Sequence, residues 1–441
     1  AKTKHNEVAP AQHELAPVFD TTNVAVDHNQ LTMEIMKKVA DKHDLVCLLH
    51  EKPFEGINGS GKHNNWSMIT DDGVNLLDPG KTPSENIQFL VFLMAVIKAV
   101  DEYADLLRIS VASAGNDHRL GANEAPPAVV SIFLGDELTE VLKSIENDTY
   151  FTSHGAVQMD IGATVLPHFV KDNTDRNRTS PFAFTGNKFE FRMLGSAASV
   201  ANPNIVLNTA VAEALDQFAK ELDGVAPEDM EHAVHELIKR AIKKHKRVIF
   251  NGNGYTDEWI EEAEKRGLYN LKSTPDALPM WIAQKNIDLF TKHSIFTSEE
   301  LHSRYEIWLE NYSKTINIES NTMVEMVQKD LLPSVMSYIE EIASTASLKA
   351  SVVPGITCES ETALITKLSE LQDAMTKGLE KLKSDTAKAR ATEDVLENAK
   401  LYQAEVLEDM EELRKSADAA ETLIPDDLLP YPTYGKLLFY I

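Results

Sequence analysis

Residues 188–193, with the sequence KFEFRM, decide the fold that we predict for this chain. Side chains two apart on a strand share a face, so Phe189 and Phe191 are expected to point into the core while Glu190 and Arg192 share the opposite face. Upstream of this strand, short apolar runs alternate with loops and helices, whereas downstream of it the pattern is almost wholly helical. The sequence therefore predicts an α+β fold whose sheet lies within roughly the first 200 residues.

Four segments follow from this change of pattern. We expect a sheet-bearing part over 1–202, a helical part packed on it over 203–358, a helical hairpin over 359–421 and an extended docking tail over 422–441. The hairpin is predicted because apolar residues recur three and four positions apart in two successive stretches. Within the first segment, the pattern indicates a helix that begins at Asp27, a buried strand over 45–49, a long apolar helix over 84–107 and an acidic helix over 136–146.

The composition bounds the class of partner. The chain of 441 residues carries 43 lysines and arginines against 69 aspartates and glutamates, a formal net charge of −26. Such acidity argues against nucleic acid and anionic membranes as partners, but a small anion needs only a local basic pocket. The two cysteines, Cys47 and Cys358, lie far apart among apolar neighbours, which favours a reducing cytoplasm over a disulfide-bonded secreted protein. No apolar run reaches the length of a membrane span.

Two glutamates, Glu7 and Glu14, lie on either side of Pro10. If the chain turns near 10–12, the two carboxylates sit on adjacent strands and can face each other. Carboxylates that close repel unless a cation lies between them, so this segment is a candidate site for Mg²⁺ or Mn²⁺. The alternative is a hairpin whose glutamates both face solvent.

A glycine-rich loop over 56–63 nearly matches a phosphate-binding loop. We reject that interpretation because His63 stands where the motif needs a hydroxyl, and because the residues after it are a poor helix start. The glycines still allow backbone to approach a ligand closely. His63 is therefore either a ligand for a metal or an oxyanion, or a structural histidine.

Arg119 and Glu124 carry opposite charges in a loop over 116–127 that is rich in glycine and proline. Such a loop is either a lid with a carboxylate at its tip or a solvated surface loop. From the pattern alone, the solvated surface loop is the preferred interpretation.

Arg176 and Arg178 precede the strand that carries Glu190 and Arg192. A carboxylate beside an arginine suits a metal together with an anionic group, and the alternative is a surface ion pair near an arginine loop. Taken together, the carboxylates, the histidine, the glycine loop and the arginines are what phosphoryl transfer needs, since cations bridge phosphates and arginines hold the developing charge.

The chain carries five ordered motifs that resemble those of glutamine synthetases, at residues 7–14, 52–63, 119–127, 177–178 and 189–192. The third motif and the tail at 431–434 are most similar to the large type III form of that family. The resemblance covers essentially the whole chain. It implies a catalytic domain with a curved antiparallel sheet and flanking helices, followed by a helical C-terminal region.

For function, the resemblance implies a cytoplasmic ligase of nitrogen metabolism that joins ammonium to the γ-carboxylate of L-glutamate. The products are L-glutamine, ADP and phosphate, and the route passes through γ-glutamyl phosphate. The resemblance also implies ATP as a substrate and two or three Mg²⁺ or Mn²⁺ ions per site. The expected assembly is a homo-oligomeric ring with active sites between subunits, without nucleic acid or membrane as a partner.

The residues that match family positions fall into four groups. The implied metal ligands are Glu7, Glu14, His63 and Glu190. The implied glutamate-binding residues are Asn58, Gly59, Arg119 and Arg192. The implied catalytic residues are Arg119, the flap carboxylate Glu124, which closes the site and helps with ammonium, and the phosphate-binding Arg178. The implied nucleotide contacts are Arg178, Phe19, Asn65, Ser67 and Lys188.

Two departures from the family pattern matter. Ala183 stands where the smaller forms carry a second phosphate-binding arginine, so Arg176 or another residue is expected to replace it. Further metal carboxylates and a small β-grasp domain are expected before Ala1, so we expect these residues alone to be weakly active or inactive. Two other functions stay open: a γ-glutamyl amide or polyamine ligase, and a non-catalytic ring scaffold of the same fold.

Overall fold

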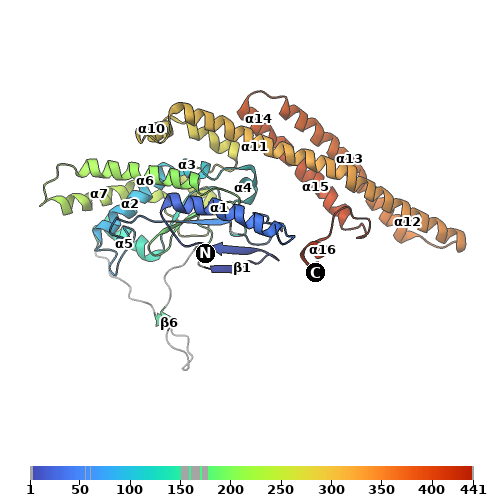
Figure 1. Cartoon of the computed structure of the whole chain (residues 1–441), viewed down its shortest axis with the longest axis horizontal. Coiled ribbons are helices and arrows are strands. Elements are labelled where there is room, and N and C mark those ends of the chain that lie inside the picture. The colour runs from blue at the N-terminus through green and yellow to red at the C-terminus, as the bar shows by residue number, and fades with distance from the viewer. Residues whose placement is uncertain are drawn as a thin grey trace. The chain divides into compact units, whose positions relative to one another are not determined.

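The computed structural model describes residues 3–54, 56–59, 61–149, 158–159, 169–170 and 177–439 (Figure 1). The chain divides into two compact units, residues 1–302 and residues 303–441. The division lies within helix α11 (Ser298–Met326) rather than at 202 or 358. The finer four-segment division stays a prediction.

The first unit contains a four-stranded sheet with the strand order β3-β8-β7-β4. Its strands are β3 (Lys62–Trp66), β4 (Ile132–Phe133), β7 (Phe182–Phe184) and β8 (Phe189–Leu194). Strand β8 pairs antiparallel with both β3 and β7, but β4 runs parallel to β7. The α+β class is confirmed, and the sheet is mixed rather than wholly antiparallel. Two short hairpin sheets pair β1 (Thr3–Asn6) with β2 (His13–Ala16), and β5 (Gln158–Met159) with β6 (Phe169–Val170).

Aromatic packing explains why 189–194 forms the central strand. The ring of Phe189 stacks on Phe182 at 4.6 Å between centroids and meets Phe184 edge-on at 5.2 Å. Phe184 in turn lies 5.9 Å from Phe89 of helix α2 (Ile87–Glu102), which buries most of its residues. Since Phe189 and Phe191 are fully buried on this face, the predicted alternation is confirmed, and Glu190 and Arg192 share the opposite face.

Helices surround this sheet in the first unit (Figure 1). Helix α2 packs against α6 (Ala201–Leu222) and α7 (Met230–His245). The others are α1 (Thr22–Asp41), α3 (Ala104–Ile109), α4 (Ala114–Arg119), α5 (Asp136–Glu146), α8 (Asp257–Lys265), α9 (Thr274–Ala277) and α10 (Gln284–Lys292), with 3₁₀ turns at Lys246–Val248 and Leu278–Ile282. No helix among the described residues combines the length and apolar character needed to cross a membrane.

Several local predictions need correction, although the acidic helix over 136–146 is confirmed. Helix α1 begins at Thr22, because the extended residue Thr21 starts it and Asp27 is tolerated inside the helix. The apolar helix expected over 84–107 is interrupted at Tyr103, whose backbone leaves the helical region with φ −123°. The first residues of the predicted loop at 116–127 belong to α4, which Ser113 caps.

The expected buried strand over 45–49 is wrong. The described residues there form no strand, and Leu45, Val46 and Leu48 are 65%, 84% and 75% exposed. An apolar run becomes a strand only where a neighbouring strand supplies hydrogen-bond partners. No described strand pairs with residues 45–49.

The second unit is a set of long helices. Helix α11 continues through a π-helical turn at Val327–Leu331 into α12 (Leu332–Val352). Helix α13 (Glu359–Arg390) packs along α15 (Leu407–Glu421), which follows α14 (Val395–Leu401) and a second π-helical turn at Tyr402–Val406. The hairpin is predicted from apolar residues that recur three and four positions apart. Several of these residues are buried where the helices pack: Leu368, Leu371, Met375, Leu382, Val406 and Leu413. A short helix, α16 (Tyr434–Phe439), lies in the tail.

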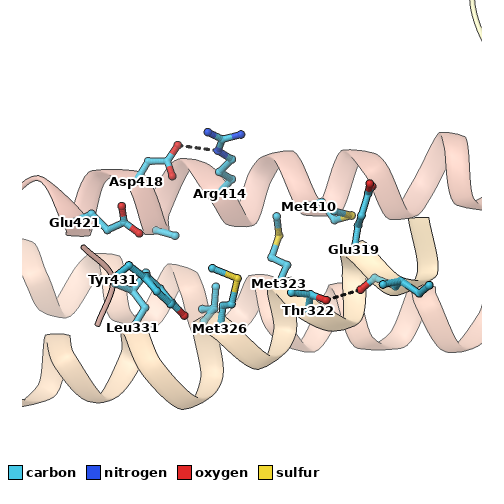
Figure 2. A pocket seen from close by; sticks show the side chains of 13 residues that line it. Glu319, Thr322, Met323, Met326, Leu331, Met410, Arg414, Asp418, Glu421 and Tyr431 are labelled. Atoms are coloured by element: carbon cyan, nitrogen blue, oxygen red, sulfur yellow. Dashed lines mark hydrogen bonds and ion pairs between the residues drawn. The ribbon is translucent and has the colours of Figure 1, made fainter. Parts of the chain in front are cut away.

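A pocket of about 430 Å³ opens on the second unit between α11, α15 and Tyr431 (Figure 2). Met323, Met326 and Met410 line it with other apolar side chains, and Glu319, Asp418 and Glu421 stand among its lining residues. None of the predicted catalytic or binding residues belongs to its lining. All of the predicted catalytic and binding residues belong to the first unit.

Candidate active site

Glu7 and Glu14 lie on a hairpin, as the proline between them predicts. The ladder pairs His5 with Glu14, and the backbone amide of Glu7 donates to the carbonyl of Gln12 at 3.0 Å. Glu7 is two residues beyond His5, so its side chain is on the same face as that of Glu14 and diagonal to it. Both glutamates are half-buried, and the register of the hairpin puts them on one face.

His63 and Glu190 approach each other across two neighbouring strands. The β3–β8 pairing shifts register between Lys62 and Asn64, where His63 of β3 lies opposite Arg192 and Met193, so the extra residue of the bulge belongs to β8. Its Nδ1 lies 4.0 Å from Glu190 Oε2. The same oxygen lies 3.0 Å from Arg192 Nη2, and the side chains of Glu190 and Arg192 are nearly buried.

These four residues have the donor chemistry of a Mg²⁺ or Mn²⁺ site, since three carboxylates and one imidazole suit a hard or borderline cation. The structure brings them together as two pairs. The part of the chain that the structure describes holds no group of three or more metal-binding side chains. The residues therefore fit two partial sites, and each needs ligands in addition to its pair.

The loop that carries Glu124 has an unusual backbone. Asn123 and Glu124 both adopt positive φ angles, 51° and 70°, which non-glycine residues keep only where surrounding contacts hold them. The amide of Gly59 donates to the Asn123 carbonyl at 3.1 Å, and Lys52 Nζ donates to the Ala122 carbonyl at 2.5 Å. The glycine-rich loop and this loop are thus fastened to each other.

The Glu124 carboxylate points between two predicted substrate-binding residues. Its Oε1 lies 2.5 Å from Arg178 Nη1 and accepts a hydrogen bond from Asn58 Nδ2 at 3.4 Å. The side chain of Arg178 is 78% exposed, and its ion pair with Glu124 holds it beside the Glu124 loop. Glu124, Asn58 and Arg178 therefore form one polar cluster, assembled from three segments distant in sequence.

Arg119 is buried rather than open to solvent, with 2% of its side chain exposed. Its Nε lies 3.0 Å from Glu51 Oε1, and its Nη1 donates to Asn116 Oδ1 at 3.0 Å and to the Met193 carbonyl at 3.1 Å. Its Nη2 donates to the Arg192 carbonyl at 3.2 Å. Arg119 therefore joins the end of α4 to the end of β8 beneath the site.

Arg192 connects this group to the cluster at Glu124. Its Nη1 donates to the carbonyl of Asn177, the residue before Arg178, at 2.6 Å. Asn177 Nδ2 donates in turn to the carbonyls of Asn251 and Gly252. A continuous set of contacts thus runs from the β8 end to the loop of Arg178.

Three of the predicted nucleotide contacts, Asn65, Ser67 and Lys188, lie on or near β3, the edge strand of the sheet. Asn65 is exposed on β3, opposite Glu190 in the pairing, and Lys188 is half-buried just before β8. Ser67 is tied down, because its hydroxyl donates to Asn75 Oδ1 at 2.8 Å and to the Asn187 carbonyl at 3.1 Å. Phe19 is 90% exposed in the segment before α1.

The arginine that the smaller forms carry has no replacement among these contacts. Ala183 is a fully buried residue of β7, where a guanidinium has no room to reach a phosphate. Arg176, the candidate replacement, lies outside the described residues. The replacement of that arginine by Arg176 or another residue therefore stays a prediction.

Lys62 supports the rejection of a phosphate-binding loop. Its ammonium group donates to the carbonyl of Ala198 and to Asn29 Oδ1, and it lies 3.0 Å from Met33 Sδ. Burial lowers the pKa of Lys62 to about 8. The lysine of a P-loop reaches a phosphate, whereas this one anchors α1 to the sheet.

Three residues near the site were missed in the sequence analysis as individual candidates: Glu51, Lys52 and Tyr255. Glu51 pairs with Arg119, and Lys52 holds the Glu124 loop. Tyr255 is half-buried, and burial together with the nearby Glu124 carboxylate raises the pKa of its hydroxyl. The only sequence signal for Tyr255 is the preceding run NGNG at 251–254, which is typical of a tight loop.

Comparisons with known proteins show which family the chain resembles. The family model described as the glutamine synthetase catalytic domain matches residues 1–130, and the model described as the glutamine synthetase C-terminal domain matches residues 233–349. A glutamine synthetase from Butyrivibrio fibrisolvens is 58% identical over 100% of this chain and 62% of its own length. A type-3 glutamine synthetase from Dictyostelium discoideum is 47% identical over 99% of this chain and 60% of its own.

A glutamine synthetase from Bacteroides fragilis is 40% identical over 99% of this chain and 61% of its own length. The chain therefore spans about three fifths of the length of these relatives.

Proposed function

Because the chain belongs to the glutamine synthetase family, we propose that it supplies most of an active site that makes L-glutamine. The reaction joins ammonium to the γ-carboxylate of L-glutamate, with ATP converted to ADP and phosphate. One observation carries the proposal: a carboxylate, Glu124, lies between an amide and an arginine on a loop held in a left-handed conformation.

The first half of the reaction transfers the γ-phosphoryl group of ATP to the γ-carboxylate, giving γ-glutamyl phosphate and ADP. Arg178 is the exposed cation for the phosphates, and it exchanges Glu124 for a phosphate oxygen. Arg192, paired with Glu190, and the backbone of the glycine-rich loop at Gly59 surround the glutamate.

In the second half, ammonia attacks the acyl carbon, the tetrahedral centre collapses and phosphate leaves. Glu124 favours the ammonium cation near this carbon and takes the proton that ammonium loses. Its carboxylate is suited to this because Asn58 orients it without burying it completely, while Arg178 holds the phosphate. Tyr255 and the strained Asn123 backbone limit the conformations that the loop can adopt.

Glu7 and Glu14 would hold one divalent cation, and His63 and Glu190 another. Such a divalent cation would offset the negative charge of the phosphates. Each pair supplies two ligands, so the remaining ligands come from elsewhere in the working enzyme. We propose that this enzyme is a homo-oligomeric ring whose sites lie between subunits.

The test is an assay of the complete protein with ATP, Mg²⁺ and glutamate, offered either ammonium or an amine such as putrescine. We expect phosphate release and glutamine formation with ammonium. Preference for the amine would replace the proposal with a γ-glutamyl amide ligase, and no turnover with either would favour a scaffold.

Glu124→Gln keeps the size of the side chain but removes the base. We expect it to lower kcat with ammonium by about 10²–10⁴-fold, the range for general acid–base groups. Glu310→Gln, which breaks an exposed helix pair with Lys314, is the matched control and should keep wild-type turnover. Equal turnover for the Glu124 variant and the control would refute the assignment of Glu124.

A further inference from the structure

Glu51 lies where four segments of the candidate site meet. It follows the apolar run at 45–49 and precedes Lys52 of the second motif. Its side chain is 13% exposed, so the carboxylate is mostly withdrawn from water. A withdrawn carboxylate is stable only when its oxygens find partners, and both do.

The two carboxylate oxygens have different partners. Oε1 lies 3.0 Å from Arg119 Nε, and Oε2 accepts a hydrogen bond from the backbone amide of Ser196 at 2.9 Å. Ser196 belongs to the turn after β8, the strand that carries Glu190 and Arg192. Burial opposes the charge, but the hydrogen bond from Ser196 and the charge of Arg119 hold the pKa of Glu51 below its ordinary value.

The backbone of Glu51 touches two further site segments. Gln12, on the hairpin of Glu7 and Glu14, donates from its Nε2 to the Glu51 carbonyl at 3.0 Å. Gly59 packs so closely on this carbonyl that a Cβ there would lie 1.8 Å from the oxygen. Glu51 therefore contacts the metal hairpin, the glycine-rich loop, Arg119 and the end of β8.

We propose that Glu51 is a positioning residue of the glutamate site: its carboxylate holds the Arg119 guanidinium and the turn after β8 in register with the glycine-rich loop. The inference rests on the proposed function, because it takes Arg119 and Gly59 as parts of the glutamate site. Its role requires a negative charge beside the Arg119 guanidinium together with an acceptor for the Ser196 amide, and a carboxylate supplies both.

A glutamine at position 51 cannot reproduce this arrangement. Its amide oxygen can still accept from the Ser196 N–H, but a neutral amide removes the negative charge that is paired with the buried Arg119 guanidinium. An aspartate keeps both acceptors on a side chain shorter by one methylene. Glu51→Asp should therefore recover part of what Glu51→Gln loses.

The experiment measures kcat and the KM values for glutamate and ATP in the complete protein, with ammonium saturating. We expect Glu51→Gln to raise the KM for glutamate about tenfold, with the KM for ATP changed less than twofold and Glu51→Asp intermediate. Glu325→Gln, which removes an exposed helix ion pair with Lys329, is the control and should leave all three constants unchanged.

Each outcome decides the matter. A glutamate KM unchanged in Glu51→Gln, equal rises in both KM values, or no recovery by Glu51→Asp would overturn the inference. If Glu51→Gln does not fold, Glu51→Asp alone must show the selective rise in the glutamate KM, about threefold, or the inference fails. Absence of glutamine formation by the wild-type protein would instead refute the proposed function.

Discussion

Arg119→Lys tests whether this buried cation supports the architecture of the site before any substrate binds. The guanidinium contacts four protein acceptors at 3.0–3.2 Å. It donates hydrogen bonds to Asn116 Oδ1 and to the carbonyls of Arg192 and Met193, and its Nε forms an ion pair with Glu51 Oε1. A lysine ammonium keeps the charge but has three N–H groups on one atom, so it cannot span acceptors arranged around a planar fork.

The magnitude follows from the acceptors that lysine leaves. If two of the four lose their donor, and a buried acceptor left unpaired costs about 1–3 kcal/mol, the free energy of unfolding falls by about 2–4 kcal/mol once partial repacking is allowed for. At roughly 2 °C per kcal/mol for a unit of this size, we expect Tm to fall by about 4–8 °C.

The assay is thermal and urea unfolding of the complete protein without substrates, followed by fluorescence of Trp66, Trp259 and Trp281 in the first unit. Arg414→Lys is the matched control, since Arg414 is 66% exposed and its ion pair with Asp418 spans one helical turn. We expect the control to change stability by less than about 0.5 kcal/mol. If Arg119→Lys is as stable as the control, Arg119 is not a structural centre and the reasoning is refuted.

Three further predictions concern the sheet and the metal residues. Phe189→Ala removes a fully buried ring stacked at 4.6 Å on Phe182, and chemical denaturation should show a loss of about 3–5 kcal/mol; a loss below 1 kcal/mol would contradict the packing. Glu190→Gln should raise the Mg²⁺ concentration for half-maximal activity about tenfold or more, and an unchanged Mg²⁺ dependence would exclude Glu190 as a ligand. Lys62 has a pKa of about 8 when folded and 10.5 when unfolded, so the unfolded chain binds more protons between these values and wild-type stability rises with pH across that window. Relative to Lys62→Met, the wild type should gain on the order of 1 kcal/mol from pH 7 to pH 10.5, after the partial exposure is discounted; a flat difference would refute this.

Local patterns predicted much of this protein. The alternation in 188–193 correctly predicted that Glu190 and Arg192 share one face of β8. The proline between Glu7 and Glu14 correctly predicted their hairpin. The heptad spacing in the second unit gave its buried seam. Each of these depends on residues a few positions apart, which strand and helix periods relate directly.

Other predictions failed where a partner was needed. The run at 45–49 is apolar enough for a strand, but it lies exposed because no described strand pairs with it. Tyr103 ends α2 within a sequence that favours continued helix. In both places the local preference is weaker than the tertiary surroundings.

The sequence by itself determined the α+β class, the family and the identity of the polar residues that meet at the candidate site. Only the tertiary structure decided that Arg119 is buried against Glu51, that His63 lies 4.0 Å from Glu190 on the neighbouring strand, and that Glu124 meets Asn58 across 66 positions of sequence. The physical reason is that periodicity relates near neighbours along one element. The partner of a buried charge is set by which distant segments the packing of the core brings together, and no local pattern records that choice.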